Sequence, residues 1–335
     1  MTRLPRLNPA VARTRRAVRE ALAGAGSAPG AGEGLVLVAL SGGADSLALA
    51  AAVAFEAPRL GLEAGAAIVD HGLQPDSAGV SEEAAAAARG LGLDPVTVER
   101  VSVPGNSEAG PEGAAREARY AALEGVRSGL GARLILTAHT RDDQAEQVLL
   151  ALARGSGARS LAGIPRRRGP ILRPFLELDR STTEAACAAQ GLSPWRDPHN
   201  SDAGYARVRV RDRILPVLEA ELGPGIAAAL ARTAELARED AEAFDDMVAE
   251  TIEEIVEPAE AGIAVSVAAL AANPAALRHR LIRAVAAAEF GSHLSREHTL
   301  AISALVTDWR GQGPIHVPGI SVARSGGLIV FTAHR

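Results

Sequence analysis

Short apolar runs alternate with longer segments of helical periodicity between residues 35 and 175. The apolar runs predict strands at residues 35–40, 66–69, 96–103, 134–136 and 171–175. The segments between them predict helices at residues 46–57, 81–91, 111–130 and 141–154. Strands that alternate with helices form a parallel sheet covered on both faces. We therefore expect a doubly wound, Rossmann-like α/β domain that binds its ligands at the carboxyl ends of the strands.

The pattern becomes helical after about residue 197, with predicted helices at 208–222 and along an acidic stretch at 226–257. A smaller unit follows, in which an extended segment (263–267), two helices (274–290 and 296–309) and a hairpin-like segment (315–331) predict an α+β fold. We divide the chain into a doubly wound domain (1–215), an acidic helical linker (216–260) and a small C-terminal α+β domain (261–335).

Composition narrows the class of protein. The chain has 335 residues, 47% hydrophobic and 22% charged, as in folded globular proteins. It shows no apolar run of about 18 residues and no secretory signal, so we expect a cytoplasmic protein without a membrane partner. All 35 basic residues are arginine, which excludes a lysine-dependent Walker loop and a Schiff-base lysine. The single cysteine, Cys187, excludes an intrachain disulfide, a CxxC pair and a cysteine zinc site.

Charge is unevenly distributed along the chain. The net charge is -5, yet residues 141–213 hold 13 arginines against 9 acids, and residues 219–260 hold 2 arginines against 13 acids. Such a basic segment can bind a polyanion despite the overall sign, although solvated helix faces explain the same distribution.

The sequence Ser41-Gly42-Gly43-Ala44-Asp45-Ser46 lies between the first predicted strand and its helix. Its glycines allow backbone N–H groups and the helix N-terminus to converge on one anion, and its two serines add hydroxyl donors. Asp45 repels phosphate, so its carboxylate suits a magnesium ion that in turn holds phosphates. The pattern resembles the pyrophosphate loop (PP-loop) of the N-type ATP pyrophosphatases. This resemblance implies that Ser41 to Ser46 bind ATP, with Mg²⁺ at Asp45.

A second motif follows the fourth predicted strand, from His139 to Gln147, and continues to Gly157. Asp143 and Glu146 lie three positions apart and therefore share a helix face near its N-terminus. Carboxylates there can simply complement the helix dipole. Next to a histidine at a strand end that faces a phosphate loop, they also suit a reaction site.

The segment from His139 to Gly157 resembles the signature of the tRNA(Ile)-lysidine synthetase family. The resemblance extends through residues 116–120, 163–165, 173–175 and 195–200 and reaches residues 281–283 and 313–319. It implies that ATP adenylates the C2 oxygen of the wobble cytidine in an isoleucine tRNA with a CAU anticodon. The ε-amine of free L-lysine then displaces AMP and gives lysidine. The product changes the tRNA to isoleucine identity and AUA decoding.

The resemblance also implies roles for single residues. Asp45, Arg119, His139, Asp143 and Glu146 would be catalytic. Arg119, or one of the arginines at 207–211, would neutralise the lysine carboxylate or the phosphates. The base that deprotonates the lysine amine stays open between His139 and Glu146. Arg207, Arg209 and Arg211 would bind tRNA, residues 1–215 would form the catalytic domain, and residues 261–335 would bind tRNA.

Further roles stay open at this stage. Trp195 or Tyr120 would stack on a flipped base, although a structural role suits either residue. The oligomeric state is not determined by the sequence, and a homodimer is one arrangement that it allows.

Three alternatives remain at this stage. PP-loop enzymes that thiolate tRNA need several cysteines, whereas Cys187 is alone, in a predicted helix away from the motifs, where it suits a small buried apolar residue. NAD and GMP synthetases share the loop but do not explain the motif at 139–157. In a non-catalytic nucleotide-binding module, Asp45 and Glu146 would be dispensable.

Overall fold

The computed structural model describes residues 7–25, 34–72, 76–102, 110–155, 157–198, 202–259 and 262–334. Several positions of the sequence motifs lie outside these ranges, namely Val103, Ser156, His199 and Asn200. The chain divides into two compact units, Met1–Ala237 and Arg238–Arg335, and each is described by itself.

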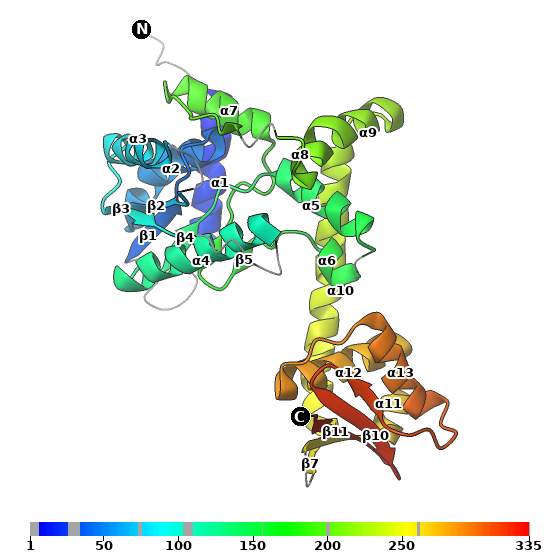
Figure 1. Ribbon diagram of the computed structural model, residues 1–335. Helices are drawn as coiled ribbons and strands as arrows, with labels where there is room; N and C mark the ends of the chain where they lie inside the picture. Colours follow the sequence, from blue (N-terminus) through cyan, green and yellow to red (C-terminus); the bar gives the residue numbers. More distant parts are fainter. Residues whose placement is uncertain are drawn as a thin grey trace. The chain divides into compact units, whose positions relative to one another are not determined.

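The first unit contains a six-stranded sheet with strand order β3-β2-β1-β4-β6-β5 (Figure 1). The strands are β1 (Leu35–Ala39), β2 (Glu63–Asp70), β3 (Val96–Arg100), β4 (Leu134–Leu136), β5 (Arg167–Arg168) and β6 (Ile171–Leu172). All neighbours pair in parallel except β5 with β6, which are antiparallel. The chain proceeds from β1 outward to β2 and β3 and then returns to β4 on the other side of β1. Loops that follow β1 and β4 therefore diverge and leave a crevice at the carboxyl ends of these strands.

Alternating side chains of β1 explain why both faces of the sheet are covered. Val36 and Val38 pack in one core with residues of α2 (Ala44–Glu56), α3 (Ser77–Gly90) and α7 (Arg180–Ala189). Leu37 and Ala39 point to the opposite face, where Leu123 and Val126 of α4 (Gly110–Gly129) cover them. Successive strand residues point to opposite faces, so a strand that is apolar throughout is buried on both sides. The predicted doubly wound α/β fold is confirmed.

Several elements differ from the sequence-based expectation. Helix α1 (Pro9–Ala25) was not predicted, although Val11, Thr14, Val18 and Leu22 are buried at helical spacing on one face. The segment predicted as one helix at 208–222 is divided into α8 (Ala206–Arg209), the π-helical η3 (Val210–Ile214) and α9 (Leu215–Leu222). A further η1 (Pro58–Leu60), α5 (Arg141–Ala153) and α6 (Ala158–Leu161) complete the first unit.

Helix α10 (Ile226–Ile255) crosses the boundary between the units, and the second unit continues from it. Its sheet is antiparallel, with strand order β7-β8-β11-β10-β9. Leu281, Ile302 and Phe331 are fully buried in its core. The predicted small α+β unit is confirmed. Its elements are β7 (Val256–Ala259), β8 (Gly262–Ser266), α11 (Val267–Ala272), α12 (Ala275–Phe290), α13 (Arg296–Thr307), β9 (Ile315–Val317), β10 (Ile320–Ser325) and β11 (Leu328–Ala333).

Among the described residues, no single helix has the length and apolar character of a membrane span. One pair, Ala206–Leu222 with Ile226–Ile255, meets those two criteria jointly but is bent by 99°.

Candidate active site

The loop between β1 and α2 forms an anion cradle. Gly42 adopts a left-handed φ of 81°, which glycine tolerates without strain, and Gly43 is the N-cap of α2. The first α-helical hydrogen bond runs from the Leu47 N–H to the Gly43 carbonyl, so the preceding amides have no acceptor within the helix. The Oγ atoms of Ser41 and Ser46 lie 3.2 Å apart beside these amides. The loop therefore offers backbone and hydroxyl donors at a helix N-terminus, as phosphate binding requires.

Asp45 lies in the first turn of α2 and is held from α7. Thr183 Oγ1 donates a hydrogen bond to Asp45 Oδ1, and Arg180 Nε lies 3.6 Å from Asp45 Oδ2. Burial raises the pKa of the Asp45 carboxyl, although Thr183 and Arg180 oppose the rise. A partly buried carboxylate whose pKa is raised in this way is suited to a further cation.

His139 directly precedes the N-cap of α5, and Asp143 lies in the first turn of this helix. Thr140 caps the helix, and Asp143 Oδ2 accepts hydrogen bonds from the Thr140 N–H (2.7 Å) and hydroxyl (3.0 Å). His139 Nδ1 lies 3.0 Å from Thr137 Oγ1. Burial, together with nearby arginines of which Arg173 has the largest effect, lowers the pKa of His139 to about 3, although Asp143 opposes the shift. His139 is therefore a neutral imidazole at neutral pH.

Glu146 lies one turn further along α5 and is completely buried. Arg211 of η3 donates to both carboxylate oxygens, from Nε at 2.8 Å and from Nη2 at 3.3 Å. Arg180 Nη2 lies 3.5 Å and Arg207 Nε 3.8 Å from the same carboxylate. Three guanidinium groups thus compensate one buried charge, so the oxygens of Glu146 have little capacity left for a substrate proton.

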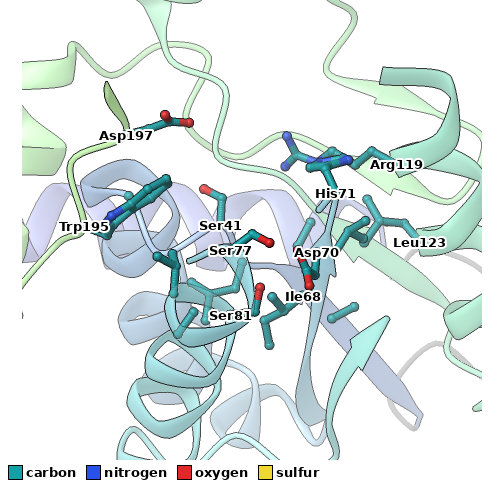
Figure 2. Close-up of a pocket in the computed structure, with 17 residues that line it drawn as sticks. Ser41, Ile68, Asp70, His71, Ser77, Ser81, Arg119, Leu123, Trp195 and Asp197 are labelled. Atoms are coloured by element: carbon teal, nitrogen blue, oxygen red, sulfur yellow. The ribbon is translucent and has the colours of Figure 1, made fainter. Parts of the chain in front are cut away.

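Two adjoining cavities, of about 320 Å³ and about 920 Å³, lie at these strand ends. The walls common to both include Ser41, Gly43, Arg119 and Trp195. Figure 2 shows the smaller cavity with Trp195 on one side, His71 and Arg119 on the other, and Ser41 between them. The larger cavity is lined by the candidate residues Asp45, His139, Asp143, Arg207 and Arg211.

Arg119 is the arginine that lines both cavities. Within the described part of the chain, its guanidinium has no carboxylate partner and no hydrogen bond. Burial, with a smaller effect of Arg116, lowers the pKa of Arg119, although the cation persists at neutral pH. An uncompensated cation that lines both cavities is suited to an anionic ligand group.

The structure brings most of the predicted site residues together, but not all. Arg207 and Arg211 line the larger cavity, and Arg207 also donates to Gln147 (2.9 Å). Arg209, by contrast, is exposed and donates to the carbonyls of Ala203 and Gly204 at 2.8 and 2.7 Å. Neither cavity includes it.

The structure corrects the position predicted for Cys187 and shows two contacts to Asp45 that the sequence did not predict. Cys187 is buried in α7 as expected, but its predicted distance from the motifs is wrong, because it lines the larger cavity together with Asp45. Arg180 and Thr183, which hold Asp45, were missed because they lie about 140 residues beyond it in the sequence. Of the two aromatic candidates, Trp195 lines both cavities, whereas Tyr120 lies beside Arg116 and lines neither.

ATP and Mg²⁺ place specific demands on the donor groups of this site. Among the described residues, no cluster of three or more His, Cys, Asp or Glu side chains is arranged to hold a metal ion. Mg²⁺ in nucleotide sites is commonly held by one or two carboxylates together with phosphates and waters, so Asp45 alone suffices on the protein side. His71 Nδ1, buried without a hydrogen-bond partner at the smaller cavity, supplies a further polar contact for a nucleoside. The residues present therefore fit both groups.

Known protein families match most of the chain. The PP-loop domain family matches residues 13–218, and the TilS substrate binding domain matches residues 266–329. The chain is 59% identical to the tRNA(Ile)-lysidine synthase of Leifsonia xyli subsp. xyli, covering 92% of this chain and 91% of that protein. It is 52% identical to the tRNA(Ile)-lysidine synthase of Thermobifida fusca, covering 97% and 98% of the two chains.

A solved structure shows the same fold at low identity. The U34-tRNA thiolase NcsA from Methanococcus maripaludis, solved with its 4Fe-4S cluster, is similar with a TM-score of 0.55 and 19% identity. The match covers 68% of this chain and 80% of that chain. Iron–sulfur clusters are held mainly by several cysteine thiolates, and this sequence contains one cysteine.

Proposed function

Because this chain belongs to the tRNA(Ile)-lysidine synthase family, we propose that it joins free L-lysine to C2 of the wobble cytidine in the isoleucine tRNA with a CAU anticodon. In the first step the C2 oxygen attacks the α-phosphorus of ATP, and pyrophosphate leaves. In the second step the ε-amine of lysine attacks C2, the C2–O bond breaks, and AMP leaves with that oxygen. The amine loses its proton, and the products are lysidine, AMP and pyrophosphate.

One observation carries this proposal: a phosphate cradle, a carboxylate-bearing helix and an uncompensated arginine meet at two adjoining cavities. The smaller cavity lies against Ser41 and Gly43 and has an apolar floor that includes Ile68, which suits the adenosine of ATP. The larger cavity is big enough for lysine and a flipped nucleotide together. ATP bound across both would place its α-phosphate near their common wall.

ATP binding would use the backbone of the loop and few side chains. The amides of residues 43–46 and the hydroxyls of Ser41 and Ser46 would hold the phosphates. Asp45 would hold Mg²⁺, which supplies positive charge to the phosphates when it is bound. Arg119 would approach the phosphates or the lysine carboxylate from the wall that both cavities share.

Lysine would bind in the larger cavity, with an ammonium group near Asp143. Of the two candidate bases, we favour His139, because the oxygens of Glu146 already face three guanidinium groups. Neutral His139 accepts a hydrogen bond from the attacking amine and holds its proton only briefly, since burial disfavours the imidazolium. Glu146 would position Arg207 and Arg211 toward the substrates.

The tRNA would contact both compact units. The match of residues 266–329 to a substrate binding domain supports contacts in the second unit. In the first unit, exposed arginines such as Arg168 and Arg209 would contact phosphates, while Arg207 and Arg211 face the reacting nucleotide. A tRNA substrate and ATP are consistent with the cytoplasmic location that the sequence predicts, and the homodimer stays a prediction.

Measurement of pyrophosphate release tests whether ATP adenylates the tRNA or the lysine. The protein is mixed with ATP, Mg²⁺ and a CAU-anticodon isoleucine tRNA transcript, without lysine. We expect pyrophosphate release that depends on this tRNA and stops after about one turnover per tRNA. Release that requires lysine but no tRNA would mean that lysine is activated instead, and would contradict the proposal.

A further inference from the structure

The guanidinium of Arg180 lies among three carboxylates that belong to two different parts of the site. Its Nε is 3.6 Å from Asp45 of the phosphate-loop helix α2. Its Nη2 donates to Asp143 Oδ1 at 3.2 Å and lies 3.5 Å from Glu146 Oε1, both on α5. One cation therefore connects the nucleotide side of the site with the side proposed for lysine.

The backbone holds Arg180 in this place. Its own N–H donates to Asp142 Oδ2 at 2.8 Å, and the Arg141 N–H donates to the Leu178 carbonyl at 2.8 Å. The Arg141 guanidinium donates to Asp179, the N-cap of α7, at 3.2 Å. The start of α7 is thus attached to the start of α5 by three hydrogen bonds that leave the Arg180 side chain free to face the cavity.

The electrostatics of the cluster make Arg180 responsive to ligands. Its side chain is 22% exposed, and Asp143 and Glu146 are 14% and 0% exposed, so these charges interact with little screening by water. Glu146 has Arg207 and Arg211 as further partners, whereas Asp45 has no other cation within 4.0 Å among the described residues. A change of charge near Asp45 or near Asp143 therefore alters how the guanidinium is shared between these two carboxylates.

We propose that Arg180 is a positioning residue that couples nucleotide binding to lysine binding by sharing its guanidinium between Asp45 and Asp143. The inference rests on the proposed function, because it takes the ligands of the two sides to be ATP and lysine. The triphosphate carries more negative charge than Mg²⁺ neutralises, so bound nucleotide adds net negative charge beside Asp45 and draws the guanidinium toward the phosphate loop. Asp143 then has a weaker competing cation and binds the lysine ammonium more tightly. By reciprocity, lysine tightens nucleotide binding by the same factor.

Calorimetric titration of the full-length protein tests the coupling. Lysine is titrated with and without Mg²⁺ and α,β-methylene ATP, which resists cleavage between the α- and β-phosphates. For the natural protein we expect lysine to bind at least about fivefold more tightly with the analogue. In Arg180→Met, which retains the length of the chain but not the charge, we expect a difference below about twofold.

Two further variants make the result specific. Arg154→Met removes an exposed arginine at the C-terminal end of α5, outside both cavities, and should keep the full coupling. Arg180→Lys keeps the charge and the fold, but an ammonium lacks the planar fork of guanidinium, so its coupling should be clearly smaller than the natural one. This variant decides the question if Arg180→Met does not fold.

Three results would overturn the inference: equal lysine affinities with and without the analogue in the natural protein, full coupling in either Arg180 variant, or loss of coupling in Arg154→Met. Lysine transfer to tRNA is measured in parallel on the natural protein. Transfer combined with any of these results leaves the proposed function intact and removes only the role of Arg180. Absence of both lysine binding and transfer would instead remove the proposed function.

Discussion

Glu146 and Arg211 form a two-point hydrogen-bonded ion pair, at 2.8 and 3.3 Å, between α5 and η3. Glu146 is completely buried, and Arg211 is 26% exposed toward the larger cavity. Because the two residues are 65 positions apart in the sequence, the pair fixes the helical segment around η3 against α5. We interpret the pair as support for the cavity wall and not as part of proton transfer.

Removing one partner of this pair should destabilise the fold. Glu146→Gln leaves up to three guanidinium groups without their buried counter-charge, and we expect a loss of about 3 kcal/mol in the free energy of unfolding. Arg211→Met should cost a similar amount, and the double variant less than the sum. Denaturant unfolding of the four proteins measures the coupling. Strict additivity would contradict the role assigned to the pair.

Asp45 should be needed for ATP chemistry but not for folding. Asp45→Asn keeps the size of the side chain and an acceptor for Thr183 but removes the charge proposed for Mg²⁺. We expect tRNA-dependent ATP cleavage to fall by at least about a hundredfold, with a melting temperature close to the natural one. Asp212→Asn, an exposed change on η3, serves as the matched control. Retained turnover in Asp45→Asn would remove the assigned role.

Arg119 should contribute to binding more than to stability. Since its guanidinium has no acidic partner among the described residues, Arg119→Met leaves no carboxylate unpaired and should change the free energy of unfolding by less than about 0.5 kcal/mol. Loss of a charged hydrogen bond should weaken binding of ATP or lysine about 10- to 100-fold. Calorimetry on both ligands identifies which one Arg119 contacts, with Arg89→Met on the exposed end of α3 as control. Unchanged affinity for both would contradict the assignment.

The lowered pKa of His139 predicts how the free energy of unfolding changes with pH. Its pKa is lowered from 6.5 to about 3 by burial and by neighbouring arginines, so the unfolded chain binds an extra proton between these values. His139 therefore costs stability as the pH falls below about 6.5, by about 1.4 kcal/mol per pH unit. The difference in free energy of unfolding between the natural protein and His139→Gln should fall by about 2 kcal/mol from pH 7 to pH 5. A constant difference would mean that His139 is protonated normally.

Binding of tRNA should depend strongly on salt. Each phosphate contact contributes roughly -0.7 to -0.9 to the slope of log affinity against log salt concentration. Arg209 is exposed and outside both cavities, so Arg209→Ala should reduce this slope by about one contact without changing lysine affinity. Arg89→Ala is again the control. A slope near zero in the natural protein would argue against phosphate contacts altogether.

Local patterns predicted the sheet and the positions of the motifs. The apolar run at residues 35–40 belongs to a strand buried on both faces, and the loop at 41–46 must follow it, so the phosphate cradle could be placed from the sequence. The same holds for His139 and Asp143, which lie between the end of β4 and the first turn of α5. In each case the deciding interactions lie within a few residues along the chain.

Long-range contacts could not be predicted in this way. Arg180 meets Asp45 across about 135 positions, and nothing near Arg180 in the sequence indicates that partner. The position of Cys187 beside the cavity depends on the packing of α7 against α2 in the same manner. Helix α1 is different, because the spacing of Val11, Val18 and Leu22 was a usable signal that the Arg-rich composition obscured.

Transfer of radiolabelled lysine to tRNA tests the central claim most directly. The natural protein is incubated with labelled lysine and an isoleucine tRNA transcript that carries a CAU anticodon, with and without ATP. A transcript with uridine at the wobble position is the control. The account predicts labelling that requires ATP and occurs only on the cytidine transcript. ATP cleavage to AMP and pyrophosphate without any label on that transcript would contradict it.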